Sequence, residues 1–445
     1  MKVLIYGLGR SGIGAGLLAE EQGHEIFFYD EQKSTPEIEM AKNKNWVNTE
    51  HINLVPADIC IAAPGVPFDH PDLVNLRSRG IETIGEVEWV SRTVQKPIIG
   101  ITGTAGKSTV TAWTSHILRR AGYDAIPGGN FDPPLSKAAT QGNLLVAELS
   151  SFQLERCPTL RPIVSAILNL GVDHIDRHGS IENYHLAKHS AVSNLGPNDN
   201  MVIPDDNSTL ESWARTINTR VWRFGKSPNS DATIACGKIE VSGKVICERE
   251  QLLLKEAHNL SNALASAVIA HAYGLAPEEI TEGLCTFQGL PGRFRHIGTI
   301  GKVAVVSDSY ATRPLAVHSA LRECTAPIVW IAGGTDKGSG LEGLEALVRN
   351  RVVLFIGVGA SGARLTKEVG KWLPAFHCTE RSGEAALECA LKRGLRHLEQ
   401  NENGEGTVLL APMASSFDQF RDYKHRGSVF TEITRRLERQ WIRDY

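Results

Sequence analysis

Short apolar runs of four to seven residues recur along the chain, each followed closely by glycine, proline or a polar residue. Such runs are typical of parallel strands that are buried on both faces of a sheet. Longer stretches with helical spacing of apolar residues, such as 109–122 and 259–275, lie between these runs. The alternation predicts an α/β fold that is repeated three times, each time around a mostly parallel sheet. We expect strands within 2–7, 24–30, 58–65, 97–103, 143–150, 165–170, 201–204, 303–308, 328–334, 352–357 and 407–412.

Two breaks in this pattern divide the chain. Pro97 opens a new strand after the helix-like stretch 87–94, and glycine and proline cluster at 289–292, before the strand at 303–308. We therefore predict a Rossmann-like domain over 1–95, a P-loop ATPase-like domain over 96–290 and a second Rossmann-like domain over 291–445. Residues 223–250 are expected to form an irregular β-hairpin attached to the middle domain.

The composition argues against several classes of protein, including nucleic-acid-binding and membrane proteins. The 445 residues include 47 Lys plus Arg against 50 Asp plus Glu, so no basic excess favours nucleic-acid binding. No apolar run approaches the roughly 20 residues needed to span a bilayer, which argues against membrane insertion. The eight cysteines are scattered without a CxxC pair, as expected for reduced thiols rather than for disulfides or a zinc site. We expect a cytoplasmic monomer.

A glycine-rich turn follows the first predicted strand. Residues 7–12 read GLGRSG, and Asp30 ends the second predicted strand. Glycines at such a turn let the backbone approach a pyrophosphate at a helix start, which by itself would favour a nicotinamide coenzyme. A similar pattern recurs at 357–362, so the motif alone is weak.

A phosphate loop is predicted at 100–109, where GITGTAGKST follows an apolar strand and enters a helix. Backbone amides of such a loop cradle phosphate oxygens, Lys107 supplies a charge, and the hydroxyl of Ser108 can ligate Mg²⁺. Ile101 stands where the strict motif has its first glycine, and the alternative is a glycine-rich turn with an incidental GKS. We interpret the segment as an ATP site.

Acidic and basic residues downstream could complete that site. Glu148 ends a predicted strand and could ligate Mg²⁺. Taken alone, His174 is more typical of a structural histidine and Lys188 of a surface lysine.

Six ordered blocks change that interpretation. In order, they are GITGTAGKST, VAELSSFQLE, LNLGVDHIDRHGS with IENYHLAK, HNLSNALAS, GLPGRF and SDSYAT. Together they resemble the Mur ligase family, the ATP-dependent amino-acid ligases of peptidoglycan precursor synthesis, over essentially the whole chain. The block PMASSFDQF at 412–420 is most similar to members that join D-glutamate to UDP-N-acetylmuramoyl-L-alanine through an acyl phosphate.

The resemblance implies roles for many residues. Lys107 would hold the β- and γ-phosphates, and Ser108 with Glu148 would bind one Mg²⁺. His174 would bind a second Mg²⁺, and Lys188 would act as a metal-binding carbamate. The remaining nucleotide contacts would be Gly103, Thr104, Gly106, Thr109, Asn259, Asn262, Arg293 and Asp308. UDP would contact Ser11, Asp30 and Gly65, and the muramoyl part would contact Asn130, Ser151 and Gln153. D-Glutamate would be held by Thr312, Lys337, Ser416 and Tyr423.

The chain departs from the family pattern at four places. Ala105 replaces an asparagine of the phosphate loop, Phe131 and Asp132 alter the block after Asn130, and Gln32 replaces an arginine near UDP. Tyr310 stands where the family has lysine, so we expect Arg313 to supply a charge for D-glutamate instead.

Alternatives remain at this stage. Asn259 and Asn262 could be ordinary helix-start residues, Gly333 and Gly334 could mark only a strand exit, and Ser416 could cap a helix that begins at Phe417. The function could also be that of another Mur-type ligase with a different amino acid, or of a folylpolyglutamate synthase. A nicotinamide-dependent oxidoreductase and a non-catalytic nucleotide-binding relative are more distant possibilities.

Overall fold

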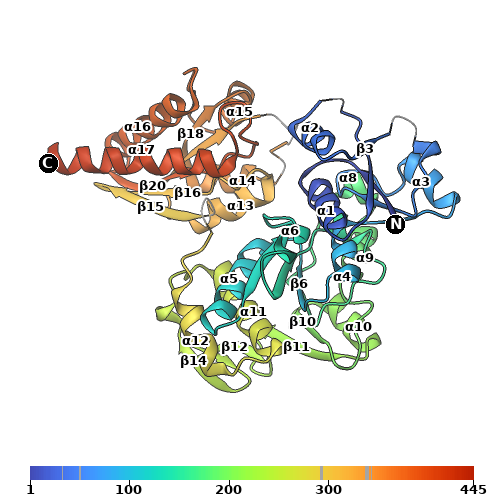
Figure 1. The fold of residues 1–445 in the computed structure, drawn as a ribbon. Coiled ribbons are helices and arrows are strands. Elements are labelled where there is room, and N and C mark those ends of the chain that lie inside the picture. Colours follow the sequence, from blue (N-terminus) through green and yellow to red (C-terminus); the bar gives the residue numbers. More distant parts are fainter. Residues whose placement is uncertain (33, 50–51, 291–293, 336–339, 342, 445) are drawn as a thin grey trace. The chain divides into compact units, whose positions relative to one another are not determined.

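Three sheets organise the protein. The computed structural model describes residues 1–32, 34–49, 52–290, 294–335, 340–341 and 343–444. The chain divides into two compact units, Met1–Gln288 with two sheets and Gly289–Tyr445 with the third (Figure 1). The predicted α/β fold with three mostly parallel sheets is therefore confirmed, whereas the domain boundaries stay a prediction.

The first sheet has five parallel strands in the order β3-β2-β1-β4-β5. Side chains of β1 alternate between two cores, since Val3 and Ile5 face one apolar cluster and Leu4 and Tyr6 face the other. Burial on both faces explains the continuous apolar run in the sequence. Its strands are β1 (Lys2–Tyr6), β2 (Glu25–Tyr29), β3 (Val47–Asn48), β4 (Ile59–Ala62) and β5 (Glu82–Ile84), and its helices are α1 (Arg10–Glu21), α2 (Pro36–Asn43), η1 (Ile52–Leu54), α3 (Pro71–Ser78) and α4 (Glu86–Thr93).

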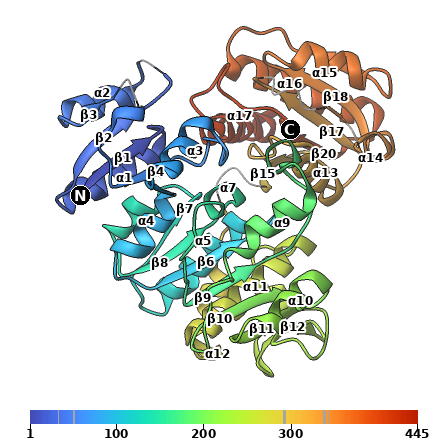
Figure 2. The ribbon, with the colours of Figure 1, turned by 90° about the vertical axis from the view of Figure 1, so that its right-hand side faces the viewer.

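The central sheet has nine strands in the order β14-β13-β12-β11-β10-β9-β6-β8-β7, most of which are visible in succession in Figure 2. The expected β-hairpin at 223–250 is confirmed and continues this sheet, because β12, β13 and β14 pair antiparallel at its edge. Its strands are β6 (Ile98–Thr102), β7 (Ala125–Gly129), β8 (Leu144–Glu148), β9 (Val164–Ile167), β10 (Asn200–Pro204), β11 (Arg220–Gly225), β12 (Ala232–Ala235), β13 (Lys238–Val241) and β14 (Lys244–Glu248). Its helices are α5 (Lys107–Arg120), α6 (Leu135–Ala139), α7 (Ser151–Leu154), α8 (Ile175–His178), α9 (Ile181–His189), α10 (Ser208–Thr216), η2 (Arg249–Gln251), α11 (Ala257–Tyr273) and α12 (Pro277–Thr286).

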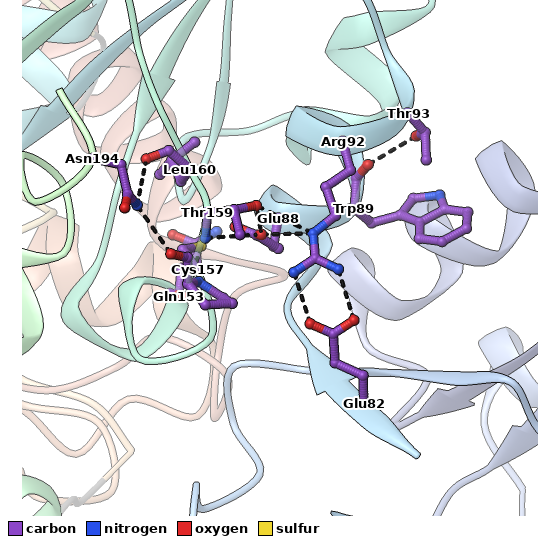
Figure 3. Close-up of polar contacts among 11 residues, drawn as sticks. Glu82, Glu88, Trp89, Arg92, Thr93, Gln153, Cys157, Thr159, Leu160 and Asn194 are labelled. Carbon is purple, nitrogen blue, oxygen red and sulfur yellow. Dashed lines mark hydrogen bonds and ion pairs between the residues drawn. The ribbon is translucent and has the colours of Figure 1, made fainter. Parts of the chain in front are cut away.

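Helix α4 joins the first sheet to the central one. Arg92 donates to both carboxylate oxygens of Glu82 at 2.8 Å and to Glu88 at 2.7 Å (Figure 3). The buried Glu88 also accepts the backbone N–H of Thr159 at 3.0 Å, in the segment that leads to β9. Trp89 lies in an apolar cluster that residues from both sheets complete. These contacts make the two sheets parts of one compact unit.

The third sheet has the order β15-β16-β20-β17-β18-β19, with only the β15–β16 pair antiparallel. Trp330 of β17 faces a cluster with α13 and α14, while Val329 and Ile331 face α16 and α17. Helix α17 runs alongside β15 (Figure 1). The elements are β15 (Arg295–Ile300), β16 (Lys302–Ser307), β17 (Ile328–Gly333), β18 (Val352–Val358), β19 (Ala375–His377) and β20 (Glu405–Leu410), with α13 (Pro314–Glu323), α14 (Glu345–Arg351), α15 (Gly362–Val369), α16 (Gly383–Asn401) and α17 (Tyr423–Asp444).

Two capping roles that we kept as alternatives are not found. No helix begins at Phe417, because the carbonyl of Ser416 accepts the N–H groups of Gln419 and Phe420 in a turn, and α17 starts only at Tyr423. Asn259 does not cap α11 either, since the cap position is Glu256 and Asn259 lies in the first turn. Within the described ranges, no helix is long and apolar enough to cross a membrane.

Candidate active site

The predicted phosphate loop connects β6 to the start of α5. Gly103 and Gly106 adopt φ angles of 152° and 84°, which side chains other than glycine rarely tolerate. A Cβ at Gly106 would lie 2.6 Å from Oδ1 of Asn262, so α11 packs directly against the loop. A glycine loop at a helix N-terminus can present N–H groups to an anion, so this geometry is compatible with the predicted phosphate loop.

Two lysines converge on this loop. Lys107 donates to the carbonyl oxygens of Gly103 at 2.8 Å and Thr104 at 3.2 Å, and Lys188 donates to Gly103 at 2.9 Å. Lys188 is 1% exposed, and its Nζ lies 4.6 Å from the centre of the Tyr184 ring. Burial, together with the nearby Lys107 ammonium, lowers the pKa of Lys188 to about 7. The prediction of a surface lysine from its residue type alone was therefore wrong.

An anionic group lies beside the start of α5. Ser108 donates its hydroxyl to Oε2 of the buried Glu148 at 2.5 Å, and Asn130 donates to Oε1 at 2.6 Å. Both oxygens of this carboxylate thus accept a hydrogen bond, one from a hydroxyl and one from an amide nitrogen. Mg²⁺ needs few protein ligands and keeps several waters, so a carboxylate and a hydroxyl at a phosphate loop fit it. Thr109 follows in the first turn of α5.

Asn169, which we did not predict, clamps the loop. Its Oδ1 accepts the N–H groups of Thr104 and Ala105, both at 2.9 Å, and its Nδ2 donates to the Ala105 carbonyl at 3.1 Å. Ala105, which replaces the family's asparagine in this loop, is therefore held through its backbone N–H and carbonyl. The available signal was an amide residue directly after a central strand, since Asn169 follows β9.

His174 adopts a left-handed conformation with φ 55° at the start of α8. Its ring lies 4.6 Å from that of Phe152, and its Nε2 lies 3.5 Å from Oδ2 of Asp173. An aspartate beside an imidazole can orient it, so the arrangement is compatible with a ligand. The role in metal binding stays a prediction.

Two of the three muramoyl-binding candidates, Ser151 and Gln153, lie on α7, and the third, Asn130, follows β7. Ser151 Oγ lies 3.0 Å from Nε2 of the buried His178, another residue that sequence reasoning missed. The side-chain oxygen of Gln153 accepts from the N–H and the hydroxyl of Ser150, which completes a capping box. The oxygen of Gln153 thus has a structural partner at the start of α7.

The UDP-binding candidates border the glycine turn of the first sheet. Asp30 accepts the N–H groups of Leu8 at 2.7 Å and Gln32 at 2.9 Å, so its carboxylate fixes the turn. Ser11 lies in the first turn of α1, and Gly65 lies in the exposed turn after β4.

Two arginines that we did not predict hold the turn at 64–66, which follows β4. Arg177 of α8 donates to the carbonyls of Gly65 at 3.3 Å, Pro64 at 3.4 Å and Val66 at 2.8 Å. Arg156 is buried and donates to the same Val66 carbonyl at 2.7 Å. Arg177 follows His174 by three residues, so the segment that carries the metal candidate also holds the turn of the UDP candidate Gly65.

The adenine candidates on α11 contact each other. Asn262 donates to Oδ1 of Asn259 at 3.3 Å, and Asn259 donates to Glu256 at 2.9 Å. Together with the contact to Gly106, this places the pair beside the phosphate loop.

The second unit gathers most of the remaining candidates. The rings of Tyr310 and Tyr423 meet edge to face, with centroids 4.9 Å apart, and Ser309 donates to the Tyr423 carbonyl at 2.8 Å. Asp308 and Thr312 flank Tyr310, and Arg313 is exposed at the start of α13. Arg293 and Lys337 lie outside the described residues.

A buried arginine organises these loops. Arg426 donates to the carbonyls of Ser309 at 2.9 Å and Ala414 at 3.1 Å, and its Nη1 lies 3.4 Å from the carbonyls of Gly333 and Ser415. The prediction missed this residue, although an arginine shortly after the 412–420 block could have indicated it. It positions the loop that carries the buried Ser416.

Comparison with known proteins decides the family. The chain is 38% identical to a UDP-N-acetylmuramoylalanine–D-glutamate ligase of Thermus thermophilus, over 96% of both chains. It is 39% identical to the ligase of the same name from Deinococcus radiodurans, over 98% of this chain and 92% of the relative. The chain belongs to the Mur ligase family. The Mur ligase middle domain matches residues 101–270, which include the phosphate loop and both asparagines of α11.

Solved Mur ligases share the fold. MurF ligase from Thermotoga maritima in complex with ADP aligns with a TM-score of 0.59 at 15% identity, over 99% of this chain and 98% of that one. UDP-N-acetylmuramate–alanine ligase from the same organism aligns with a TM-score of 0.58 at 19% identity, over 98% and 99%. As a Mur ligase, the chain is a ligase and not a nicotinamide-dependent oxidoreductase.

Proposed function

We propose that this Mur ligase joins D-glutamate to UDP-N-acetylmuramoyl-L-alanine at the expense of ATP, through an acyl phosphate. The supporting observation is that relatives at 30–39% identity over nearly the whole chain carry the name UDP-N-acetylmuramoylalanine–D-glutamate ligase. The product would serve peptidoglycan precursor synthesis. We further propose a cytoplasmic monomer with domains over 1–95, 96–290 and 291–445.

The nucleotide would bind at the loop between β6 and α5. Lys107 and the loop N–H groups would hold its β- and γ-phosphates, and Asn259 and Asn262 would contact adenine. Arg293 and Asp308 are assigned to the nucleotide on the family pattern. Preorganised positive charge of this kind is the main source of acceleration in phosphoryl transfer.

Mg²⁺ would be held by Ser108 and Glu148, with His174 and Lys188 at a second ion. When bound, the ions would neutralise charge on the phosphates. The carboxylate of Glu148, already buried between Ser108 and Asn130, supports this assignment.

Lys188 would serve as a carbamate. A pKa of about 7 leaves a large fraction of its amine neutral near neutral pH, and the neutral amine can attack carbon dioxide. The attack forms an N–C bond, opens one C=O bond of carbon dioxide to an oxygen anion and releases one proton from the amine. Together with the proton that the ammonium loses beforehand, a cation becomes an anionic oxygen ligand. The Lys188 ammonium repels the Lys107 ammonium, whereas the carbamate anion would attract it.

The substrates would lie at the other candidate residues. Ser11, Asp30 and Gly65 would contact UDP, and Asn130, Ser151 and Gln153 the muramoyl part. D-Glutamate would contact Thr312, Arg313, Lys337, Ser416 and Tyr423. The fixed turns around Asp30 and Arg426 support these assignments, because both hold backbone in one conformation.

Phosphate release in the presence of ATP and Mg²⁺ tests the proposal. We expect release only when UDP-N-acetylmuramoyl-L-alanine and D-glutamate are both present, and the Lys107→Ala variant should be inactive. Turnover with another amino acid instead of D-glutamate would favour the alternative, a Mur-type ligase of different specificity, which the tyrosine at 310 makes worth testing. No turnover with any amino acid would favour a non-catalytic relative.

A further inference from the structure

The second unit contains a group of three potential metal ligands, two thiols and one carboxylate. Cys378 directly follows β19, Cys389 lies in α16, and Glu380 lies in the turn between them. One ligand atom from each residue lies within 4.8 Å of the other two. In the sequence these cysteines are eleven residues apart, so no CxxC spacing reveals the group.

The two thiols are in direct contact. Cys378 donates its S–H to Sγ of Cys389 at 3.1 Å, and Cys378 is 3% exposed within the apolar cluster beneath α16. Burial raises the pKa of both thiols, whereas the nearby guanidinium of Arg393 acts in the opposite direction. Arg393 is fixed over the Phe376 ring, 3.3 Å from its centre. A bound cation would favour both thiolates, because coordination replaces the two thiol protons.

The geometry suits a tetrahedral ion after a small adjustment. Zinc–sulfur bonds of about 2.3 Å at tetrahedral angles place two sulfur atoms roughly 3.8 Å apart, so the thiols need to separate by about 0.7 Å. Thiolates select Zn²⁺ over harder ions such as Mg²⁺, and a carboxylate completes a third position. The exposed Glu380 leaves the fourth position open to water.

A second cysteine pair offers an internal comparison. Cys247 and Cys285 are hydrogen-bonded to each other, and burial raises the pKa of Cys247 to about 12. Within the described residues, no His, Asp or Glu joins this pair as a third ligand. The carboxylate is therefore what distinguishes the Cys378–Cys389 pair.

We propose that Cys378, Cys389 and Glu380 form a binding site for a thiophilic divalent cation, with Zn²⁺ as the biological candidate. Binding breaks two S–H bonds, forms two metal–sulfur bonds and releases two protons to solvent. The ion would cross-link the end of β19 to α16. The site is independent of the proposed ligase reaction.

Titration of the reduced, chelator-treated full chain with Co²⁺ tests this site. We expect thiolate-to-cobalt charge-transfer absorption that saturates at one equivalent and disappears when Zn²⁺ is added. C378S and C389S should abolish this absorption, and E380Q should weaken binding about 10- to 100-fold. The double variant C247S/C285S and the exposed-thiol variant C236S should bind as the wild type does.

A second measurement covers variants that fail to fold. In the wild type, Zn²⁺ should protect Cys378 and Cys389 from alkylation, as detected by mass spectrometry, but not Cys236. Absence of a charge-transfer band, or an unchanged band in C378S, would overturn the proposal. The proposal would also be overturned if Cys378 and Cys389 escape alkylation without Zn²⁺ because they form a disulfide in air. None of these readouts requires ligase activity.

Discussion

Lys107 and Lys188 donate their ammonium groups to one shared acceptor, the carbonyl oxygen of Gly103. Two like charges around one carbonyl repel each other, which contributes to the lowered pKa of Lys188. If Lys188 becomes an anionic carbamate, the same proximity turns into attraction. The shared carbonyl therefore places the proposed modification next to Lys107, the candidate phosphate-binding lysine.

Lys188→Ala should lose activity by roughly 10²–10³-fold or more, because it removes a charged group from the proposed metal site. Small carboxylic acids that fill the vacated space should restore part of the rate. Lys188→Arg should resist rescue, since its guanidinium cannot react with carbon dioxide and occupies the space. Initial rates with and without added acid check this, and a fully active Lys188→Ala enzyme contradicts it.

Arg177→Lys should raise the Michaelis constant for the UDP substrate about 10-fold or more. One ammonium cannot replace a planar group that contacts three consecutive carbonyls, so the turn at Gly65 loosens. The constants for ATP and D-glutamate should change much less. Arg120→Lys is the matched control, because Arg120 pairs with Glu282 at the exposed surface of the same unit, outside the candidate substrate residues. Equal effects of the two variants would refute the positioning role.

Arg313→Ala should raise the Michaelis constant for D-glutamate by roughly 10- to 100-fold, the usual range for one charge-assisted hydrogen bond. The reason is that Tyr310 offers a phenol, which cannot supply a positive charge, at a position where the family has lysine. The constant for ATP should stay nearly unchanged. Unchanged glutamate kinetics would leave Lys337 as the expected cation.

Glu86 should make stability depend on pH. Its Oε1 accepts the N–H of Ser136 at 2.6 Å, and burial raises the pKa of this carboxyl from 4.5 to about 7. The folded state then binds more protons than the unfolded state between these values. Stability should therefore fall as pH rises from about 4.5 to 7, by up to about 3 kcal/mol.

Glu86→Gln should lack this contribution, because its amide does not titrate. Urea unfolding of both proteins at pH 5 and pH 8 measures the difference. We expect the variant to gain relative to the wild type at pH 8. Parallel pH profiles of the two proteins would show that Glu86 does not titrate in this range.

Strands were predictable where burial on both faces produced continuous apolar runs, as in β1, β8 and β17. Strand β7 was missed because Pro127, Gly128 and Gly129 in the sequence are typical of a turn. Ser416 resembles a helix cap in the sequence, but its carbonyl closes a turn, and Arg426 binds the carbonyls of Ala414 and Ser415 just before it. Such tertiary contacts leave no local pattern.

In the candidate site, too, residues within a local motif could be predicted, whereas residues that act through tertiary contacts were missed. Lys107 and Ser108 could be found because their spacing within a glycine loop is itself informative. Asn169, Arg177 and Arg426 were missed, because each acts by binding backbone carbonyls or N–H groups whose positions exist only in the folded chain, and a place near a motif is a weak signal. The burial of Lys188 was likewise invisible to periodicity, since it depends on packing against Gly103 and Tyr184.

The joint made by α4 limits how the protein could be recombined with its relatives. The apolar cluster around Trp89 takes residues from both of the first two sheets, so a cut near residue 95 would expose it on both fragments. A cut at 288–289 separates compact units instead. Chimaeras that exchange residues 1–288 as a single cassette should therefore express in soluble form, whereas exchange of residues 1–95 alone should require compatible partners at α6 and at 154–160.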